Sequence, residues 1–150
     1  MSGSRDRLVV RPRVPGDDAT CASILAEAWN SALPDARRSV SLDQFRDETL
    51  DETVLVAVLG ERVVGFVAIW EPESFIHHLY VQPDSQRSGV GSALLLEACS
   101  VVTQGRVWLK TQDRNQIARD FYSARGFRST EDSGEDEYGR WIAMELLLHR

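Results

Sequence analysis

The most constraining feature of this chain is a short glycine-rich segment, Gln86-Arg87-Ser88-Gly89-Val90-Gly91-Ser92, placed between an apolar run and a helix-like run. The apolar run spans 75–81 and ends before Pro83, and the helix-like run spans 92–98. The first N–H groups of a helix lack partners within the helix, and the helix dipole makes that end partly positive. Because Gly89 and Gly91 have no Cβ, a large anion can approach these N–H groups closely. The segment therefore predicts an anion pocket, with a pyrophosphate as the expected ligand.

Two common pyrophosphate-binding motifs do not fit this segment. The dinucleotide fingerprint G-x-G-x-x-G would need a glycine where the chain has Leu94, and the string G-x-x-x-x-G-K-[ST] occurs nowhere. The remaining pattern, Q-x-x-G-x-G after a strand, resembles the GCN5-related N-acetyltransferase (GNAT) family. Members of that family carry [QR]-x-x-G-x-[GA] at this point and wrap it around the pyrophosphate of acetyl-coenzyme A. The resemblance therefore implies acetyl-coenzyme A as the cosubstrate.

A second segment supports the same resemblance. Residues 115–127 read N-Q-I-A-R-D-F-Y-S-A-R-G-F and are similar to the family's pattern N-x-x-A-x-x-[FL]-Y-x-x-x-G-F. Gly126 stands where a helix commonly ends in a left-handed residue, and Phe127 can cover that end with apolar surface. The two signatures occur in the order that the family shows, with a strand between them. The resemblance covers most of residues 54–147.

The order of predicted elements is that of an α/β fold. Apolar patterns and turn signals predict strands at 8–11, 54–59, 62–70, 75–81, 106–110, 127–130 and 140–147, and helices starting at Asp17, Ser41, Ser92 and Asn115. The resemblance implies a mixed central sheet of about six to seven strands flanked by about four helices. We expect a single domain over 1–150, with a flexible tail at 1–6. The acidic residues around Ser133-Gly134 are expected in the loop of the closing hairpin, either solvated or beside the acceptor site; they are Glu131, Asp132, Glu135, Asp136 and Glu137.

Composition narrows the class of ligand and the location. The formal net charge of −6 and the pI of about 5.1 argue against nucleic acid, which requires a basic face, and mildly favour a cationic acceptor such as an amine. Most cytoplasmic proteins are acidic, however, so this preference is weak. No apolar run approaches the ~18 residues of a membrane span, and the first residues lack the apolar part of a signal peptide. We therefore expect a cytoplasmic protein without a membrane partner and, because no metal-ligand spacing occurs, without a metal.

The resemblance also assigns roles to the strand that ends at Val81 and to its neighbours. In the family, a backbone N–H of this strand binds the thioester carbonyl; the matching residues here are Leu79, Tyr80 and Val81, with Val81 the favoured donor. Tyr122 matches the tyrosine that protonates the departing thiolate, although a helix tyrosine can also simply pack into the core. Asn115 is expected to contact the pantetheine arm, to cap its own helix, or both.

The general base is the least defined role. An alkyl amine with a pKa of ~10.4 is almost entirely protonated at pH 7, so a group that removes its proton is needed. His77 aligns with a catalytic histidine of the arylalkylamine acetyltransferase branch, and His78 is the neighbouring candidate. Strand alternation predicts that their side chains lie on opposite faces. A carboxylate or an ordered water is the alternative, with Glu71 and Glu73 the carboxylates to consider.

These assignments predict an N-acetyltransferase that moves the acetyl group directly to a primary amine of a small molecule or peptide. The alternative is a non-catalytic acyl-coenzyme A sensor or an inactive paralogue, but the intact Tyr122 and Asn115 favour catalysis. N-terminal acetyltransferases of ribosomal proteins are a second alternative, but their glutamate base corresponds to Lys110 in this chain. A nucleotide-binding regulatory module would need a ribose- or base-reading motif, and none is found. Dimers are common in the family, so a homodimer is an open expectation.

Overall fold

The structure is a computed structural model that describes residues 7–149; the tail expected at 1–6 lies outside them. Its centre is a seven-stranded sheet in the order β1-β2-β3-β4-β5-β7-β6. The strands are β1 (Leu8–Pro12), β2 (Thr53–Leu59), β3 (Arg62–Trp70), β4 (Phe75–Val81), β5 (Arg106–Gln112), β6 (Arg128–Asp136) and β7 (Gly139–Leu147). The α-helices of the described residues are α1 (Asp18–Ala32), α2 (Leu42–Glu48), α3 (Val90–Val101) and α4 (Gln116–Ser123). The predicted α/β class, strand number and helix number are confirmed.

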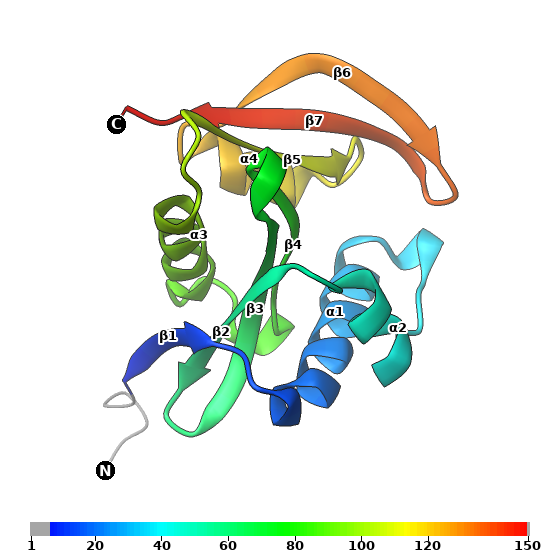
Figure 1. Ribbon diagram of the computed structural model, residues 1–150. Coiled ribbons are helices and arrows are strands. Elements are labelled where there is room, and N and C mark those ends of the chain that lie inside the picture. The colour runs from blue at the N-terminus through cyan, green and yellow to red at the C-terminus, as the bar shows by residue number, and fades with distance from the viewer. Residues whose placement is uncertain (1–6, 150) are drawn as a thin grey trace.

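Helices cover both faces of the sheet, with α1 and α2 on one side and α3 on the other (Figure 1). On the first side, Cys21, Ile24 and Leu25 of α1 pack with Phe45 of α2 and Phe66 of β3. On the second side, α3 and α4 form an apolar cluster with inward side chains of β3, β4, β5 and β7. Burial of apolar surface is the main favourable term in folding, so these two clusters hold the helices against the sheet.

The sheet opens between β4 and β5. These two strands run parallel, and they pair only at Phe75↔Trp108 and Ile76↔Leu109. β5 continues beside β7, with which it pairs antiparallel along its whole length, and β4 continues beside β3 as far as Val81. The sheet is therefore mixed, as predicted, and among residues 7–149 no strand pairs with one edge of the C-terminal half of β4.

The closing hairpin differs from the prediction. Of the acidic residues expected in its loop, Glu131, Asp132, Glu135 and Asp136 lie in β6, and only Glu137 is in the turn that joins β6 to β7. β6 is an exposed edge strand, so its sequence lacks the alternation of apolar and polar side chains that marks a half-buried strand. The hairpin tip extends toward the loop between α1 and α2 (Figure 1), where Tyr138 packs against Trp29 with a ring-centroid distance of 4.8 Å.

Candidate functional site

The loop at 86–92 carries a row of unpaired backbone N–H groups. The Gln86 side-chain amide donates a hydrogen bond to Val81 O at 3.1 Å and ties the loop to the end of β4. Gly89 adopts a left-handed φ of +86° and is the N-cap residue of α3. Within the described residues, no acceptor is found for the N–H groups of residues 87–92. A row of this kind at a helix N-terminus is able to bind an anion, the ligand that the sequence leads us to expect there.

Ser88 and Arg87 shape the turn that leads into α3. The Ser88 hydroxyl donates a hydrogen bond to the Ser85 carbonyl, and Arg87 adopts a left-handed φ of +68°. A positive φ is unfavourable for a residue with a Cβ, and such residues cluster at binding sites. Both residues are exposed, whereas Val90, the first residue of α3, is buried. The loop is thus anchored at Val90 while its N–H groups stay available.

Gly89 and Gly91 serve different purposes. A Cβ on Gly89 would meet no atom within 4 Å, so the space beside it is open. A Cβ on Gly91 would lie 3.1 Å from ring carbons of Phe121, so this glycine lets the first turn of α3 approach α4. Ser92 accepts hydrogen bonds from Arg125 Nη2 and Nε at 2.7 and 3.0 Å, a contact that sequence reasoning missed. The open space and the guanidinium both suit a pyrophosphate.

The edge of β4 that borders the opening carries two further N–H groups. Gln82 N donates to Val64 O at 2.8 Å, so this pair is hydrogen-bonded across β3 and β4. Alternation along an antiparallel pair then directs the N–H of Tyr80 toward β3 and those of Leu79 and Val81 toward the opposite edge. β5 has already diverged from β4 there. The N–H groups of Leu79 and Val81 therefore point to the open edge, whereas that of Tyr80 points to β3.

Two tyrosines, Tyr122 of α4 and Tyr80 of β4, carry protonated hydroxyls that influence one another electrostatically. Burial raises the pKa of Tyr122 above its ordinary range and raises the pKa of Tyr80 to about 12. The Tyr122 ring packs edge-on against Phe121 and Phe127, with centroid distances of 5.1 and 5.3 Å. No hydrogen-bond partner for either hydroxyl is found in the described part of the chain, and neither oxygen is completely enclosed. Both are therefore available as hydrogen-bond donors at neutral pH.

The two histidines of β4 lie on the same face, so the prediction from alternation is wrong. The pairing of β3 with β4 shifts between Ala68 and Ile69, which leaves His77 as an extra residue in a β-bulge. Ile76 consequently packs with the α3-side cluster. The rings of His77 and His78 stack with a centroid distance of 3.9 Å. Because the bulge adds one residue to β4, the alternation of side chains shifts by one position at His77. Both imidazoles therefore lie on the side of the sheet that α1 and α2 cover.

Each histidine faces a glutamate that sequence reasoning missed. His77 Nδ1 lies 2.7 Å from Glu52 Oε2, and the Glu52 side chain is 8% exposed, with Oε1 buried and without a partner in the described residues. His78 Nε2 lies 3.4 Å from Glu48 Oε1. Glu48 ends α2 and Glu52 precedes β2, so tertiary folding alone brings them to β4. The result is a compact group of two carboxylates and two imidazoles.

The carboxylates expected beside the histidines, Glu71 and Glu73, lie elsewhere. Both belong to the short turn 71–73 between β3 and β4 and are exposed. Glu71 accepts a hydrogen bond from the Thr53 hydroxyl and none from a histidine. No local pattern in the sequence could have shown this, because the contact between Glu52 and His77 spans 25 residues.

The remaining predicted residues are placed as follows. Asn115 Oδ1 accepts a hydrogen bond from Ala118 N at 3.1 Å, which confirms the helix cap, and its side-chain N–H₂ has no acceptor in the described residues. Lys110 lies on β5, and its Nζ is 4.3 Å from the centroid of the Trp141 ring. In residues 7–149, no group of three or more His, Cys, Asp or Glu side chains is arranged to hold a metal ion. No helix in the same range combines the length and apolar character needed to cross a bilayer.

The buried His78 predicts a loss of stability at acid pH. Burial, reinforced by the nearby charges of His77 and Arg38, holds the pKa of His78 well below its ordinary value. Below pH ~6.5 the unfolded chain binds a proton at this residue and the folded chain does not, so the free energy of unfolding falls by up to about 1.4 kcal/mol per pH unit. Urea unfolding at pH 7.5 and 5.5 should therefore show a steeper decline for the wild type than for His78→Gln. The exposed His149→Gln is the control and should keep the wild-type slope; a wild-type slope in His78→Gln would contradict the assignment.

The chain is similar in sequence to known acetyltransferases. The Acetyltransferase (GNAT) family matches residues 19–127. Two similar proteins come from Escherichia coli (strain K12): the uncharacterized N-acetyltransferase YafP, 22% identical with 97% of each chain covered, and the peptidyl-lysine N-acetyltransferase YiaC, 33% identical over 51% of this chain and 50% of its own.

Solved structures share the fold. The PaiA N-acetyltransferase from Thermoplasma acidophilum, in complex with coenzyme A, has a TM-score of 0.77 at 18% identity, over 94% of this chain and 99% of its own. YncA, a putative acetyltransferase from Salmonella typhimurium with acetyl-coenzyme A, has a TM-score of 0.67 at 19% identity, over 95% of each chain. The family match spans more than half of the chain and includes the glycine-rich loop, the β4 histidines and Tyr122. The chain therefore belongs to the GNAT family and is an acyltransferase that uses acetyl-coenzyme A.

Proposed function

We propose that this protein acetylates a primary amine of a small molecule or peptide by direct transfer from acetyl-coenzyme A. The observation that carries the proposal is the row of unpaired N–H groups at residues 87–92, which follows directly after the open edge of β4. The row suits a pyrophosphate, and the open edge suits an extended chain with hydrogen-bonding groups. Acetyl-coenzyme A supplies the acetyl thioester when bound, and the groups that assist its transfer belong to the protein.

The backbone of β4 and Tyr122 supply two of these functions. Leu79 and Val81 offer N–H groups fixed by the sheet, and one such donor stabilises negative charge developing on a carbonyl oxygen by roughly 3 kcal/mol. Tyr122 Oη keeps its proton because burial raises the pKa of the phenol. A phenol with a raised pKa donates a hydrogen bond to a developing thiolate more readily than it releases the proton completely. We place the free side-chain N–H₂ of Asn115 beside the pantetheine arm as part of this proposal.

We assign removal of the amine proton to His77. Its Nδ1 is held by Glu52, its Nε2 has no partner in the described residues, and its side chain is 35% exposed. A carboxylate that orients an imidazole in this way leaves the second nitrogen free to accept a proton. His78 is a weaker candidate because its side chain is 5% exposed and its pKa is well below the ordinary value.

His77→Gln is expected to lower kcat/KM for the amine by about 10²- to 10⁴-fold, the usual contribution of a general base. KM for acetyl-coenzyme A should stay close to the wild-type value, and the acid limb of the pH–rate profile should disappear. Glu52→Gln removes the charge that orients His77 and should cause a smaller loss. His149→Gln is the control for an exposed histidine. A His77→Gln enzyme with wild-type rate and an intact acid limb would assign the base to another group.

The reaction is tested by thiol release from acetyl-coenzyme A with a panel of small amines, amino acids, aminoglycosides and short peptides. Turnover above the acceptor-free rate supports the proposal and narrows the acceptor. If no amine of the panel is acetylated although calorimetry demonstrates coenzyme A binding, the sensor or inactive paralogue would be favoured. A preference for ribosomal-protein N-termini would favour the second alternative, for which Lys110 offers no carboxylate base.

Three further expectations from the sequence belong to the same proposal. They are a cytoplasmic location, one catalytic domain over 1–150, and a homodimer. Sedimentation of the purified chain at micromolar concentration tests the last of these, because a dimer would have twice the mass of 16.8 kDa.

A further inference from the structure

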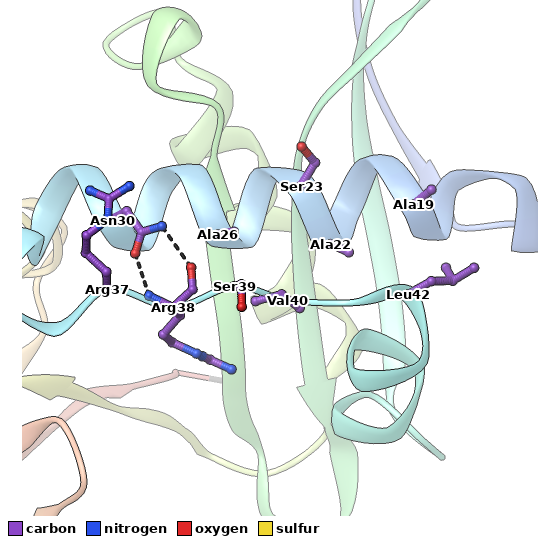
Figure 2. Close-up of a pocket in the computed structure, with 10 residues that line it drawn as sticks. All are labelled: Ala19, Ala22, Ser23, Ala26, Asn30, Arg37, Arg38, Ser39, Val40 and Leu42. Carbon is purple, nitrogen blue, oxygen red and sulfur yellow. Dashed lines mark hydrogen bonds between the residues drawn. The ribbon is translucent and has the colours of Figure 1, made fainter.

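Arg38 is held in place more firmly than an ordinary surface arginine. Its backbone N–H donates to Asn30 Oδ1 at 2.7 Å, and its backbone carbonyl accepts from Asn30 Nδ2 at 2.8 Å. The side-chain amide of Asn30 on α1 therefore binds both polar groups of the Arg38 backbone (Figure 2). These residues border a groove of about 730 Å³ between α1 and residues 37–42, and the Arg38 side chain points away from α1 (Figure 2). That side chain is 9% exposed, whereas the neighbouring Arg37 is an exposed residue.

The Arg38 guanidinium lies among residues of the candidate site. Its Cζ lies 5.1 Å from the Trp29 ring centroid and 5.3 Å from that of Tyr138 at the hairpin tip. Nη2 donates to Glu48 Oε2 at 2.8 Å. Its charge also acts on the Tyr80 phenol of β4. Four segments, α1, α2, β4 and the hairpin tip, therefore meet around one largely buried cation.

The polar groups left open around Arg38 are donors. Arginine has five N–H bonds, and within residues 7–149 only Nη2 of this side chain has an acceptor. Nε and Nη1 are not enclosed, since neither is among the fully buried polar atoms without a partner. The hydroxyl of Tyr80, on which the Arg38 charge acts, is not completely enclosed either. The acceptor Glu48, by contrast, is already engaged. Its Oε2 accepts a hydrogen bond from Arg38, and its Oε1 lies 3.4 Å from His78 Nε2.

This arrangement suits an anion better than a second cation. A substrate ammonium is normally recognised by a carboxylate or by the face of an aromatic ring. Glu48 is already engaged, and the rings of Trp29 and Tyr138 already receive the guanidinium. A carboxylate can bind the open edge of an arginine whose other edge holds a second carboxylate, with the planar geometry that arginine favours.

We propose that Arg38 binds a carboxylate of the acceptor, so that the protein acetylates small amines that also carry a carboxylate, such as amino acids. The inference rests on the proposed function and names its substrate class. Arg38 is joined to the proposed base by consecutive contacts. Glu48 lies between Arg38 and His78 at 2.8 and 3.4 Å, and His78 stacks on His77 at 3.9 Å. The acceptor would place its carboxylate at Arg38 and its amine toward His77.

The test uses matched pairs of ligands, and one arm does not depend on turnover. N-acetylated amino acids and their N-acetyl amides are titrated by calorimetry into the protein saturated with coenzyme A. At least one N-acetyl amino acid should bind more than about 10-fold tighter than its amide, as expected for a charged hydrogen bond. In the kinetic arm, amino acids should be acetylated with a higher kcat/KM than the corresponding amino acid amides and decarboxylated amines.

The variants separate anion recognition from folding. Arg38→Met alone would leave Glu48 without its cation, so Arg38→Met combined with Glu48→Gln keeps the charge balanced. The double variant should lose the preference for the carboxylated ligand through a rise of about 10- to 100-fold in its KM or Kd, with KM for acetyl-coenzyme A unchanged. Arg37→Gln removes the same charge from the exposed neighbour and should behave as the wild type.

The outcomes distinguish this inference from the proposed function. Acetylation of amines without discrimination between acid and amide would overturn the carboxylate site and leave the transferase intact. Binding of N-acetyl amino acids that depends on Arg38, without turnover of any amine, would support the site and contradict the transferase. The inference is also wrong if no N-acetyl amino acid binds in calorimetry, or if the double variant keeps the full preference.

Discussion

Tyr122→Phe is expected to lower kcat for acetyl transfer by one to three orders of magnitude and to leave KM for acetyl-coenzyme A nearly unchanged. The phenylalanine ring keeps the edge-on contacts with Phe121 and Phe127, at 5.1 and 5.3 Å, so the packing of α4 is preserved. The substitution removes only the hydroxyl, which has no hydrogen-bond partner in the described residues and therefore contributes little to stability. Steady-state rates with a fixed acceptor, together with the thermal midpoint, measure both expectations.

Tyr138→Phe is the matched control for Tyr122→Phe. Tyr138 also packs its ring against an aromatic neighbour, Trp29, but it belongs to the β6–β7 turn and not to the edge of β4. Its variant should retain wild-type kcat within about threefold. An equal kcat in Tyr122→Phe and the wild type would remove Tyr122 from the chemistry and leave it as a core residue. A large drop in the thermal midpoint without a drop in kcat would lead to the same conclusion.

The local structure that was predicted correctly in this region is set by neighbouring residues. The start of a helix after the loop at 86–92 was recognisable because glycines follow a strand there, and the structure adds that Gly89 uses the left-handed φ of +86° that glycine tolerates. Asn115 caps α4 through its own side chain, a contact that spans three residues. The order of strands and helices followed from similarly local patterns, which tertiary packing then stabilised.

The parts that were predicted wrongly depend on pairing between distant segments. Alternation placed His77 and His78 on opposite faces, but the β-bulge puts an extra residue into β4 and stacks the two rings. A bulge depends on the register between two strands, which one strand cannot reveal by itself. Glu48 and Glu52 approach the histidines only once α2 has packed against the sheet.

The edge strand β6 illustrates a different limit. Its residues are mostly exposed, so no apolar face repeats every second position, and its acidic content is typical of a loop. Pairing with β7 nevertheless makes it a strand over Arg128–Asp136. Charged side chains at an edge disfavour association with other strands, which explains why such a composition suits this position.

Gly89→Val is expected to reduce the affinity for coenzyme A by more than about 100-fold. The isopropyl group would project into the open space beside the row of N–H groups, where a Cβ meets no atom within 4 Å, and so would block an approaching pyrophosphate. The loss of several charged hydrogen bonds at about 1.5–3 kcal/mol each accounts for the magnitude. The φ of +86° adds backbone strain of about 1–3 kcal/mol, so the fold should persist with a lower thermal midpoint. Calorimetric titration below that midpoint measures the affinity.

Backbone strain and steric blockage can be separated with Gly60→Val. Gly60 also has a left-handed φ, of +67°, but it lies in the turn between β2 and β3 and not in the loop at 86–92. This control should lose stability to a similar degree and bind coenzyme A as the wild type does. If Gly60→Val lost affinity as strongly as Gly89→Val, general destabilisation would explain both results. If Gly89→Val bound coenzyme A with undiminished affinity, the pyrophosphate would have to bind away from the N-terminus of α3, and the proposed placement of the whole cosubstrate along β4 would fall with it.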